Sequence, residues 1–282
     1  MKRLCLTMIA VFVSVLLVAC GGTKGSNADA NWKAIQERGT LKVATSGTLF
    51  PQSFHDKQNK LTGYDVEIIK EIGKRLNLNI KFTEMGVDGM LSALNSGQID
   101  VAGYSIEKDS KNAKKFLYTD SHKYSFGSMI VRQSDDSGIK SLKDLKGKKA
   151  AGASTTSYMK VAKKFGAELV IYDNVTNDVY LQDVANGRTD VILNDFYLQT
   201  MASKALPEIP VKVLKDVYYN PSESNFALKL GNKTLQKKMN KALEEMKKDG
   251  TLTKLSKKFF AGQDVSKEKK YDFKKIDVSD VE

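Results

Sequence analysis

Residues that usually carry covalent or metal chemistry are scarce in this sequence. Its 282 residues include two cysteines and two histidines. Both cysteines, Cys5 and Cys20, lie at the N-terminus in a leader segment, which leaves none for a disulfide framework or a metal site. No Walker loop, nucleophile elbow or zinc-ligand pattern is present, and a lone histidine is more often structural than catalytic. We therefore expect no cofactor, no metal and no enzymatic activity.

The positive charge of the chain lacks the pattern of a nucleic-acid-binding protein. The formal net charge is +12, of which Lys2 and Arg3 belong to the leader. The other lysines are scattered along predicted helix faces, without the aromatic residues of a nucleic-acid motif. An apolar fraction of 41% and a charged fraction of 28% are typical of a soluble globular protein. The composition thus predicts a globular protein, long enough for two lobes, with no nucleic-acid partner.

The first 20 residues have the parts of an export signal. Lys2-Arg3 form the charged start, and Leu4 to Val18 form an apolar run that is too short for a permanent membrane helix. Leu17 to Cys20 (LVAC) resembles the bacterial lipobox, which implies removal of residues 1–19 and lipidation of Cys20. Residues 20–30 then form a flexible tether. The alternative is an ordinary signal peptide with a chance cysteine; we favour the anchor, on the extracytoplasmic face of the cell membrane.

Two stretches share a helix–stop–strand pattern, which predicts two similar α/β units. In the stretch Leu181 to Asp195, apolar residues at helical spacing precede Asn186-Gly187, where glycine allows a helix to end. Val191 to Leu193 then form a short apolar run, typical of a strand buried on both faces. The residues that recur at equal offsets are Leu91, Gly97, Asp100 and Val101 in the first unit and Leu181, Gly187, Asp190 and Val191 in the second. Two facing α/β sheets would form a cleft at their strand ends, where such sheets bind ligands.

Polar residues at these strand ends suggest a site for a zwitterion. Asp195 directly follows a strand and could bind a cation, or could only cap the helix that follows. Residues 154–157 (STTS) open another helix, where backbone N–H groups and the Thr156 hydroxyl favour an anion, although capping alone would also explain them. Phe54 and Tyr104 could supply apolar walls around such a ligand.

Six segments together resemble the family 3 extracellular solute-binding proteins, the polar amino-acid receptors of ABC importers. They are GTLKVATSGT (39–48), KLTGYDVEIIKEIGKRL (60–76), DGMLSALNSGQIDV (88–101), IKSLKDLKGKK (139–149), ANGRTDVILND (185–195) and ALEEMKKDGTLTKLSKKFF (242–260). Each segment is weak alone, but their order and spacing cover nearly all of the chain after the leader. The resemblance implies an α/β, two-lobed, periplasmic-binding-protein-like fold of type II, with two hinge strands and a ligand cleft between the lobes.

The resemblance also implies a division of the chain after the tether. We expect lobe 1 at residues 31–124 plus 226–262, and the hinge strands with lobe 2 at residues 125–225. Residues 263–282 are highly charged, which predicts a disordered tail. We expect a monomer that contacts an ABC transporter permease.

Seven residues are expected to bind the ligand. In the family, the threonine matching Thr156 helps bind the ligand α-carboxylate, and the aspartate matching Asp195 binds the α-amino group. The aromatic residue matching Phe54 packs on the ligand. The full expected set is Phe54, Tyr104, Ser105, Thr155, Thr156, Ser157 and Asp195.

The sequence departs from the family at the carboxylate-binding arginine. The family usually places this arginine after the third strand of lobe 1, where this chain has Asn112, or Ser110 in a shifted alignment. Neither residue replaces a bidentate arginine–carboxylate pair. Val87 stands where an aromatic residue is common. The stretch KDGTLTKLSKKFFAGQDVSK (248–267) looks most like the cystine-binding branch.

We therefore predict a lipid-anchored receptor that captures cystine or another polar amino acid and delivers it to an ABC importer. One alternative is a dehydratase-type enzyme on the same fold, which would need a general acid such as Glu107. The other is a surface sensor or adhesin that has lost transport. The lipid anchor is expected of a receptor or a sensor and is not needed by a soluble enzyme.

Overall fold

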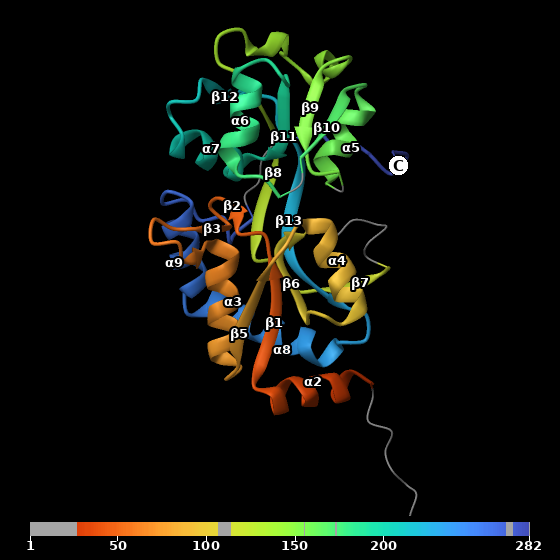
Figure 1. The fold of residues 1–282 in the computed structure, drawn as a ribbon, viewed down its shortest axis with the longest axis vertical. Helices are drawn as coiled ribbons and strands as arrows, with labels where there is room; N and C mark the ends of the chain where they lie inside the picture. Colours follow the sequence, from red (N-terminus) through yellow and green to blue (C-terminus); the bar gives the residue numbers. More distant parts are fainter. Residues whose placement is uncertain (1–26, 107–113, 155, 173, 269–272, 282) are drawn as a thin grey trace, which may run out of the picture.

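Two α/β lobes, joined by two long strands, make up this computed structural model (Figure 1). It describes residues 27–106, 114–154, 156–172, 174–268 and 273–281. The elements of lobe 1, the lower lobe in Figure 1, are α2 (Asn27–Arg38), β1 (Thr40–Thr45), β2 (Thr48–Leu49), β3 (Ser53–His55), β4 (Leu61–Thr62), α3 (Tyr64–Arg75), β5 (Asn79–Glu84), α4 (Val87–Ser96), β6 (Val101–Ile106), β7 (Phe116–Tyr118), α8 (Lys233–Lys248) and α9 (Thr251–Phe259). Those of lobe 2 are the 3-10 turns η1 (Asp136–Gly138) and η2 (Leu142–Leu145), then β9 (Lys149–Gly152), α5 (Ser157–Lys164), β10 (Glu168–Ile171), α6 (Asn177–Ala185), β11 (Val191–Asp195), α7 (Phe196–Ala205) and β12 (Val211–Val213). The two-lobed α/β fold expected from the sequence is confirmed.

The strands β8 (Lys123–Arg132) and β13 (Tyr219–Lys229) run from one lobe to the other and pair with each other. β8 also pairs with β11 and β12 in lobe 2, whereas β13 also pairs with β6 and β7 in lobe 1. Hydrogen bonding is therefore continuous, in the order β10-β9-β11-β8-β13-β6-β1-β5. This differs from two separate facing sheets, because β8 is bonded to lobe 2, β13 is bonded to lobe 1, and the two crossover strands are bonded to each other.

The pattern repeated in the sequence forms the same local structure twice. α4 ends with Gly97 as its C-cap, and α6 ends with Asn186 as its C-cap followed by Gly187; both glycines have a positive φ. Asp100 then accepts a hydrogen bond at 2.8 Å from the backbone N–H of Lys42 on β1. Asp190 accepts the equivalent bond at 2.9 Å from the backbone N–H of Lys149, on β9. Each aspartate thus ties the start of its own strand to the neighbouring parallel strand, which explains why an aspartate recurs at this offset.

Burial of β11 determines where Asp195 emerges. Val191, Ile192 and Leu193 are at most 3% exposed. Val191 and Leu193 belong to one apolar cluster and Ile192 to another, as expected of a strand whose successive side chains point to opposite faces. Burying each of these side chains contributes about 1.5–3 kcal/mol. The strand is therefore fixed in register, and the next residues of the chain lie at its carboxyl end, facing lobe 1.

Several described residues of the C-terminal tail pack against the lobes, which differs from the disorder expected. Val265 is 1% exposed, and the ring of Phe273 lies 4.9 Å from that of Phe126, between centroids. The Asn220 side chain donates to the backbone C=O of Ile276 at 2.8 Å and accepts from its N–H at 2.6 Å. The expectation rested on charge density alone, whereas apolar residues spaced through the tail supply these contacts.

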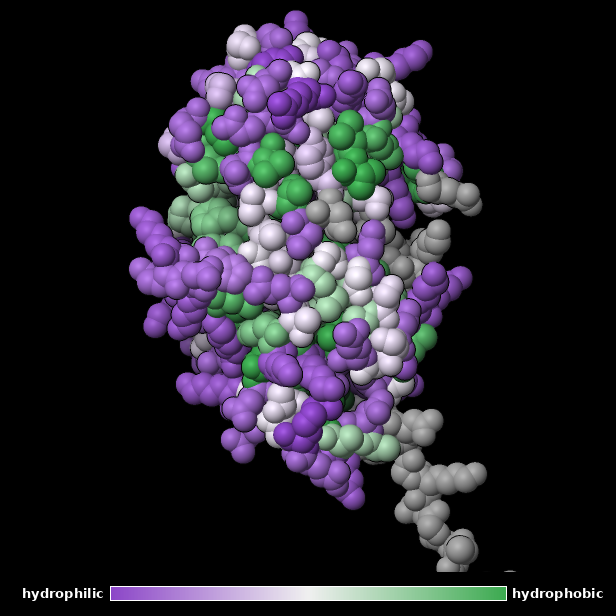
Figure 2. Space-filling model, in the orientation of Figure 1, coloured by the Kyte–Doolittle hydropathy of each residue, from purple (hydrophilic) through white to green (hydrophobic). Residues whose placement is uncertain are grey.

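The outer surface is mainly polar. The face shown in Figure 2 is mostly hydrophilic, with apolar patches that gather on the upper lobe. The large exposed apolar side chains among the described residues are Ile171, Val179 and Leu230. Across the described ranges, no helix combines the length and the apolar character needed to cross a membrane. Cys20 and the whole leader lie outside the described residues.

Candidate ligand-binding site

A cavity of about 140 Å³ lies between the lobes, at the carboxyl ends of parallel strands. Its wall includes Tyr104 on β6, Lys123 on β8, Thr156 before α5 and Asp195 on β11. A second cavity of about 90 Å³ shares part of this wall. Both are smaller than the roughly 300–1,000 Å³ typical of drug-sized ligand sites, so the space suits a small solute.

A larger groove of about 1250 Å³ runs elsewhere, along β7, β13 and the C-terminal segment. It follows the sides of these strands and not the carboxyl ends of parallel ones, where open α/β sheets bind ligands. Polar groups along it are already bonded to one another, as where Asn225 donates to the Thr119 carbonyl at 2.9 Å and to the Ser121 hydroxyl at 3.1 Å. We therefore place the ligand site in the smaller cavity.

Hydrogen bonds join the two lobes around the cavity. The backbone N–H of Phe50 in lobe 1 donates to the side-chain oxygen of Asn177 in lobe 2, at 3.2 Å. The hydroxyl of Ser154 in lobe 2 donates to the carboxylate of Asp88 in lobe 1, at 3.4 Å. The described arrangement is therefore closed, with wall residues of both lobes facing the same space.

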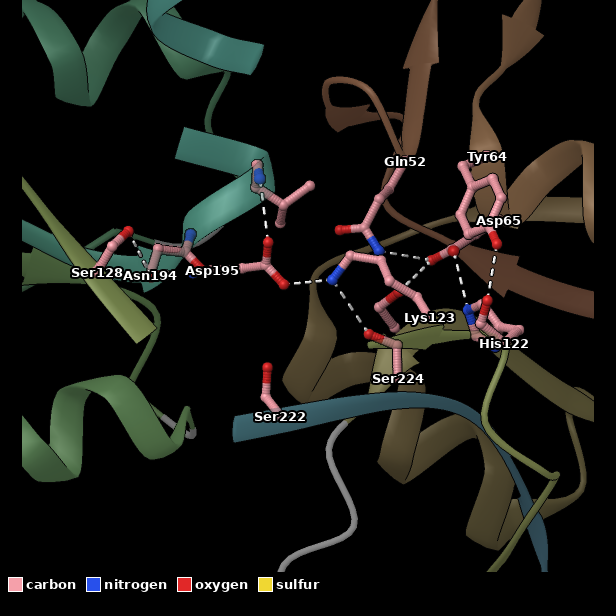
Figure 3. A network of polar contacts seen from close by, with 12 residues as sticks. Gln52, Tyr64, Asp65, His122, Lys123, Ser128, Asn194, Asp195, Ser222 and Ser224 are labelled. Carbon is pink, nitrogen blue, oxygen red and sulfur yellow. Dashed lines mark hydrogen bonds and ion pairs between the residues drawn. The ribbon is translucent and has the colours of Figure 1, made fainter. Parts of the chain in front are cut away.

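Asp195 is buried and uses its two oxygens differently. It is 3% exposed, and its Oδ1 accepts a hydrogen bond at 3.0 Å from the backbone N–H of Leu198, which caps α7. Its Oδ2 accepts from the Nζ of Lys123, an ion pair that bridges the lobes (Figure 3). Of the two roles considered from the sequence, the helix cap is present, and the other oxygen of Asp195 pairs with a lysine of the protein itself.

Lys123 was missed by sequence reasoning. It is the first residue of β8, it is 1% exposed, and its Nζ also donates to the hydroxyl of Ser224 at 3.4 Å. Removing one partner of a buried ion pair costs about 3–5 kcal/mol, because the other charge is left uncompensated. One indirect indication of such a residue was present in the sequence. The chain lacks the family's carboxylate-binding arginine, so another basic residue could take its place in the cavity.

A second buried network supports the lobe 1 side of the cavity (Figure 3). Asp65 is fully buried and accepts from the hydroxyl of Ser105 at 2.9 Å and from the amide of Gln52 at 3.3 Å. It also contacts Nε2 of His122 at 3.1 Å, and the His122 ring stacks on Phe226 with centroids 4.2 Å apart. These bonds fix Ser105 and Gln52, both of which line the cavity.

The structure brings most of the expected site residues together. Those that line the cavity are Tyr104, Ser105, Thr156, Ser157 and Asp195. Phe54 is not among the lining residues; its ring packs edge-on against Phe50, at 4.9 Å, and Phe259, at 6.5 Å. Thr155, Ser110 and Asn112 lie outside the described residues.

The hydroxyl of Thr156 is engaged in helix capping. It donates to the backbone C=O of Ala153 at 3.0 Å and accepts from the backbone N–H of Met159 at 3.3 Å. Tyr104 lines the other side of the cavity, where burial raises the pKa of its phenol, helped by the negative charges of Asp65 and Asp195. Tyr104 is therefore a neutral hydroxyl at physiological pH. Among the described residues, no group of three or more His, Cys, Asp or Glu side chains could hold a metal ion.

Comparisons with known proteins agree with this architecture. Residues 41–262 match the family model of the bacterial extracellular solute-binding proteins, family 3. The probable ABC transporter extracellular-binding protein YckB of Bacillus subtilis (strain 168) is 51% identical over 268 residues, which cover 94% of this chain and 93% of that protein. The L-cystine-binding protein TcyA of the same organism is 37% identical over 280 residues, covering 95% and 100%. A crystal structure of YckB matches with a TM-score of 0.71 and 55% identity, covering 87% of this chain and 99% of that one.

The chain belongs to the bacterial extracellular solute-binding proteins, family 3. The resemblance drawn from the six sequence segments is thereby confirmed.

Proposed function

We propose that this protein captures an amino acid outside the cytoplasm and delivers it to an ABC importer. The observation that carries the proposal is the buried carboxylate of Asp195 in the cavity between the lobes, at the end of a parallel strand. The relatives named as an ABC transporter binding protein and an L-cystine-binding protein support it. The ligand is L-cystine or another polar amino acid.

The roles within the site follow from its charges and donors. Asp195 binds the ligand's α-ammonium group, and the start of α5 at Thr156 and Ser157 binds its α-carboxylate. Thr155 is assigned to the same group on the sequence alone. Tyr104 and Ser105 form the opposite wall. Phe54 supports the site indirectly, because its ring packs on Phe50, whose backbone N–H is bonded to Asn177 of lobe 2.

The protein is a monomer anchored by lipid on Cys20, after removal of residues 1–19. The sequence Leu17 to Cys20 supports this part of the proposal. Changing Cys20→Ala should shift the protein from the detergent phase to the aqueous phase in detergent partitioning. Partitioning that stays the same as in the wild type would contradict the anchor.

Binding, and not catalysis, is the proposed activity. Among the described residues, the cavity wall includes one acid, Asp195, which is already bonded to a lysine and to a backbone N–H. Glu107, the acid considered for a dehydratase, lies outside the described residues.

A thermal-shift screen of the purified protein against the twenty protein amino acids and L-cystine tests the proposal. A ligand at 100 times its dissociation constant stabilises the folded state by about 2.7 kcal/mol. At roughly 2–4 °C per kcal/mol for a protein of this size, the Tm should rise by about 5–10 °C. The proposal fails if none of these compounds raises the Tm.

A further inference from the structure

In the part of the chain that the structure describes, the cavity wall carries one positive and one negative side chain. Among the described wall residues of both adjoining cavities, the charged ones are Lys123 and Asp195. Both side chains are nearly inaccessible, at 2% and 5% exposure. Lys123 reaches the cavity from the lobe 1 end of β8, and Asp195 reaches it from lobe 2 (Figure 3). The wall thus contains the two charges that would complement a zwitterion, already paired with each other.

From this pair we infer that Lys123 binds the α-carboxylate of the ligand and makes the site select for it. The inference rests on the proposed amino-acid function. It gives Lys123 the role of the positive partner of the ligand carboxylate, which the family's arginine has and which no arginine fills in this chain. A zwitterion that enters between the two side chains separates them, and each then has a new partner of opposite charge. The N-terminus of α5 adds hydrogen bonds to the same carboxylate.

The exchange explains why both ligand charges are needed. A ligand with an ammonium group alone would take Asp195 and leave Lys123 buried without a counter-charge. A ligand with a carboxylate alone would do the same to Asp195. Uncompensated buried charges are strongly unfavourable, so the resident pair rejects both kinds of ligand. The flexible stem of lysine and the nearby Ser224 hydroxyl, 3.4 Å from Nζ, allow the ammonium group to shift without losing every partner.

The test compares an amino acid with its isosteric primary amide, which keeps the ammonium group and loses the carboxylate charge. The amino acid is the one that gives the largest shift in the screen above, and affinities come from calorimetry. Wild type should prefer the acid by roughly 30- to 4,000-fold, as expected for a charged partner in a desolvated site. Lys123→Met should reduce this preference to about tenfold or less, whereas Lys123→Arg should keep most of it.

Two further variants make the result decisive. Lys123→Gln keeps a hydrogen-bond donor for Asp195 and replaces the Met variant if that variant does not fold. It should reduce the preference for the acid over the amide as much as Lys123→Met does. Lys212→Met removes an exposed lysine that pairs with Asp136, outside the cavity, and should leave the preference unchanged.

The possible failures can be distinguished. If no amino acid binds wild type, the proposed function is wrong and this inference falls with it. If amino acids bind but Lys123→Met and Lys123→Gln keep the wild-type preference within about threefold, the inference alone is wrong. Equal tightening of acid and amide in these variants would likewise overturn it, because Lys123 would then only compete with the ligand for Asp195.

Discussion

Replacing Asp195 by asparagine would separate its charge from its role as a helix cap. Asparagine and aspartate cap helices about equally well, so the bond from the Leu198 N–H can persist. The substitution removes the negative charge that is proposed to bind the ligand's ammonium group. Losing a charged partner in a desolvated site costs about 2–5 kcal/mol. At 1.4 kcal/mol per tenfold, that is roughly a 30- to 4,000-fold loss of affinity.

The same substitution affects the folded state, and the two effects must be measured apart. Lys123 would lose its counter-charge, which costs about 3–5 kcal/mol of stability if the lysine stays charged and buried. Asp195→Ala would remove the cap of α7 as well, which costs about 0.5–2 kcal/mol of stability in addition. Urea unfolding followed by circular dichroism gives the change in the free energy of unfolding. Binding is measured only for variants that are folded.

Calorimetry with the best ligand of the screen gives the binding term. Asp190→Asn is a matched control, because this carboxylate lies just before the same strand, bonds to the Lys149 N–H and does not line the cavity. It should bind within about threefold of wild type. If Asp195→Asn also binds within about threefold, under ~0.7 kcal/mol, the amino-acid interpretation of the cavity is wrong, and the fold assignment is unaffected.

Two predictions concern the scaffold. Hydrogen bonds from Thr251 lower the pKa of Asp249 from 3.8 to about 2. The ionised carboxylate therefore stabilises the folded state at pH values above the unfolded-state pKa, and this stabilisation is lost as the pH falls through about 2. The stability gap between wild type and Asp249→Asn should therefore be full at neutral pH and shrink near pH 2; a gap that does not change with pH contradicts this. In Gly127→Ala, the new Cβ would lie 2.3 Å from the buried ring of Tyr219 between the crossover strands, which should cost about 1–3 kcal/mol in urea unfolding. Gly89→Ala, whose nearest neighbour is 3.8 Å away, is the control, and equal stabilities of the two variants would show that the crossovers tolerate the added atom.

Local patterns made much of the fold predictable. A helix that ends at glycine, followed by aspartate and an apolar run, depends on contacts close in sequence, so both copies could be recognised before their partners were known. The Lys42 and Lys149 N–H groups that bond to Asp100 and Asp190 could not be foreseen, because they come from other strands. The packed tail was missed for the same reason: charge density describes the segment, whereas Phe273 is ordered by Phe126.

Asp195 could be predicted and Lys123 could not, although they form one ion pair. The aspartate stands at a strand end that the apolar run defines, so its place follows from its neighbours in sequence. The lysine is one of 45 basic residues, and its burial depends on a partner 72 positions away. Charge balance nevertheless narrows the choice of partners, because a buried carboxylate is costly when its charge is not compensated. The sequence left Asp195 as either a helix cap or the partner of a ligand cation, and only the fold, through the pairing of β8 with β11 and β13, shows that Lys123 lies beside it.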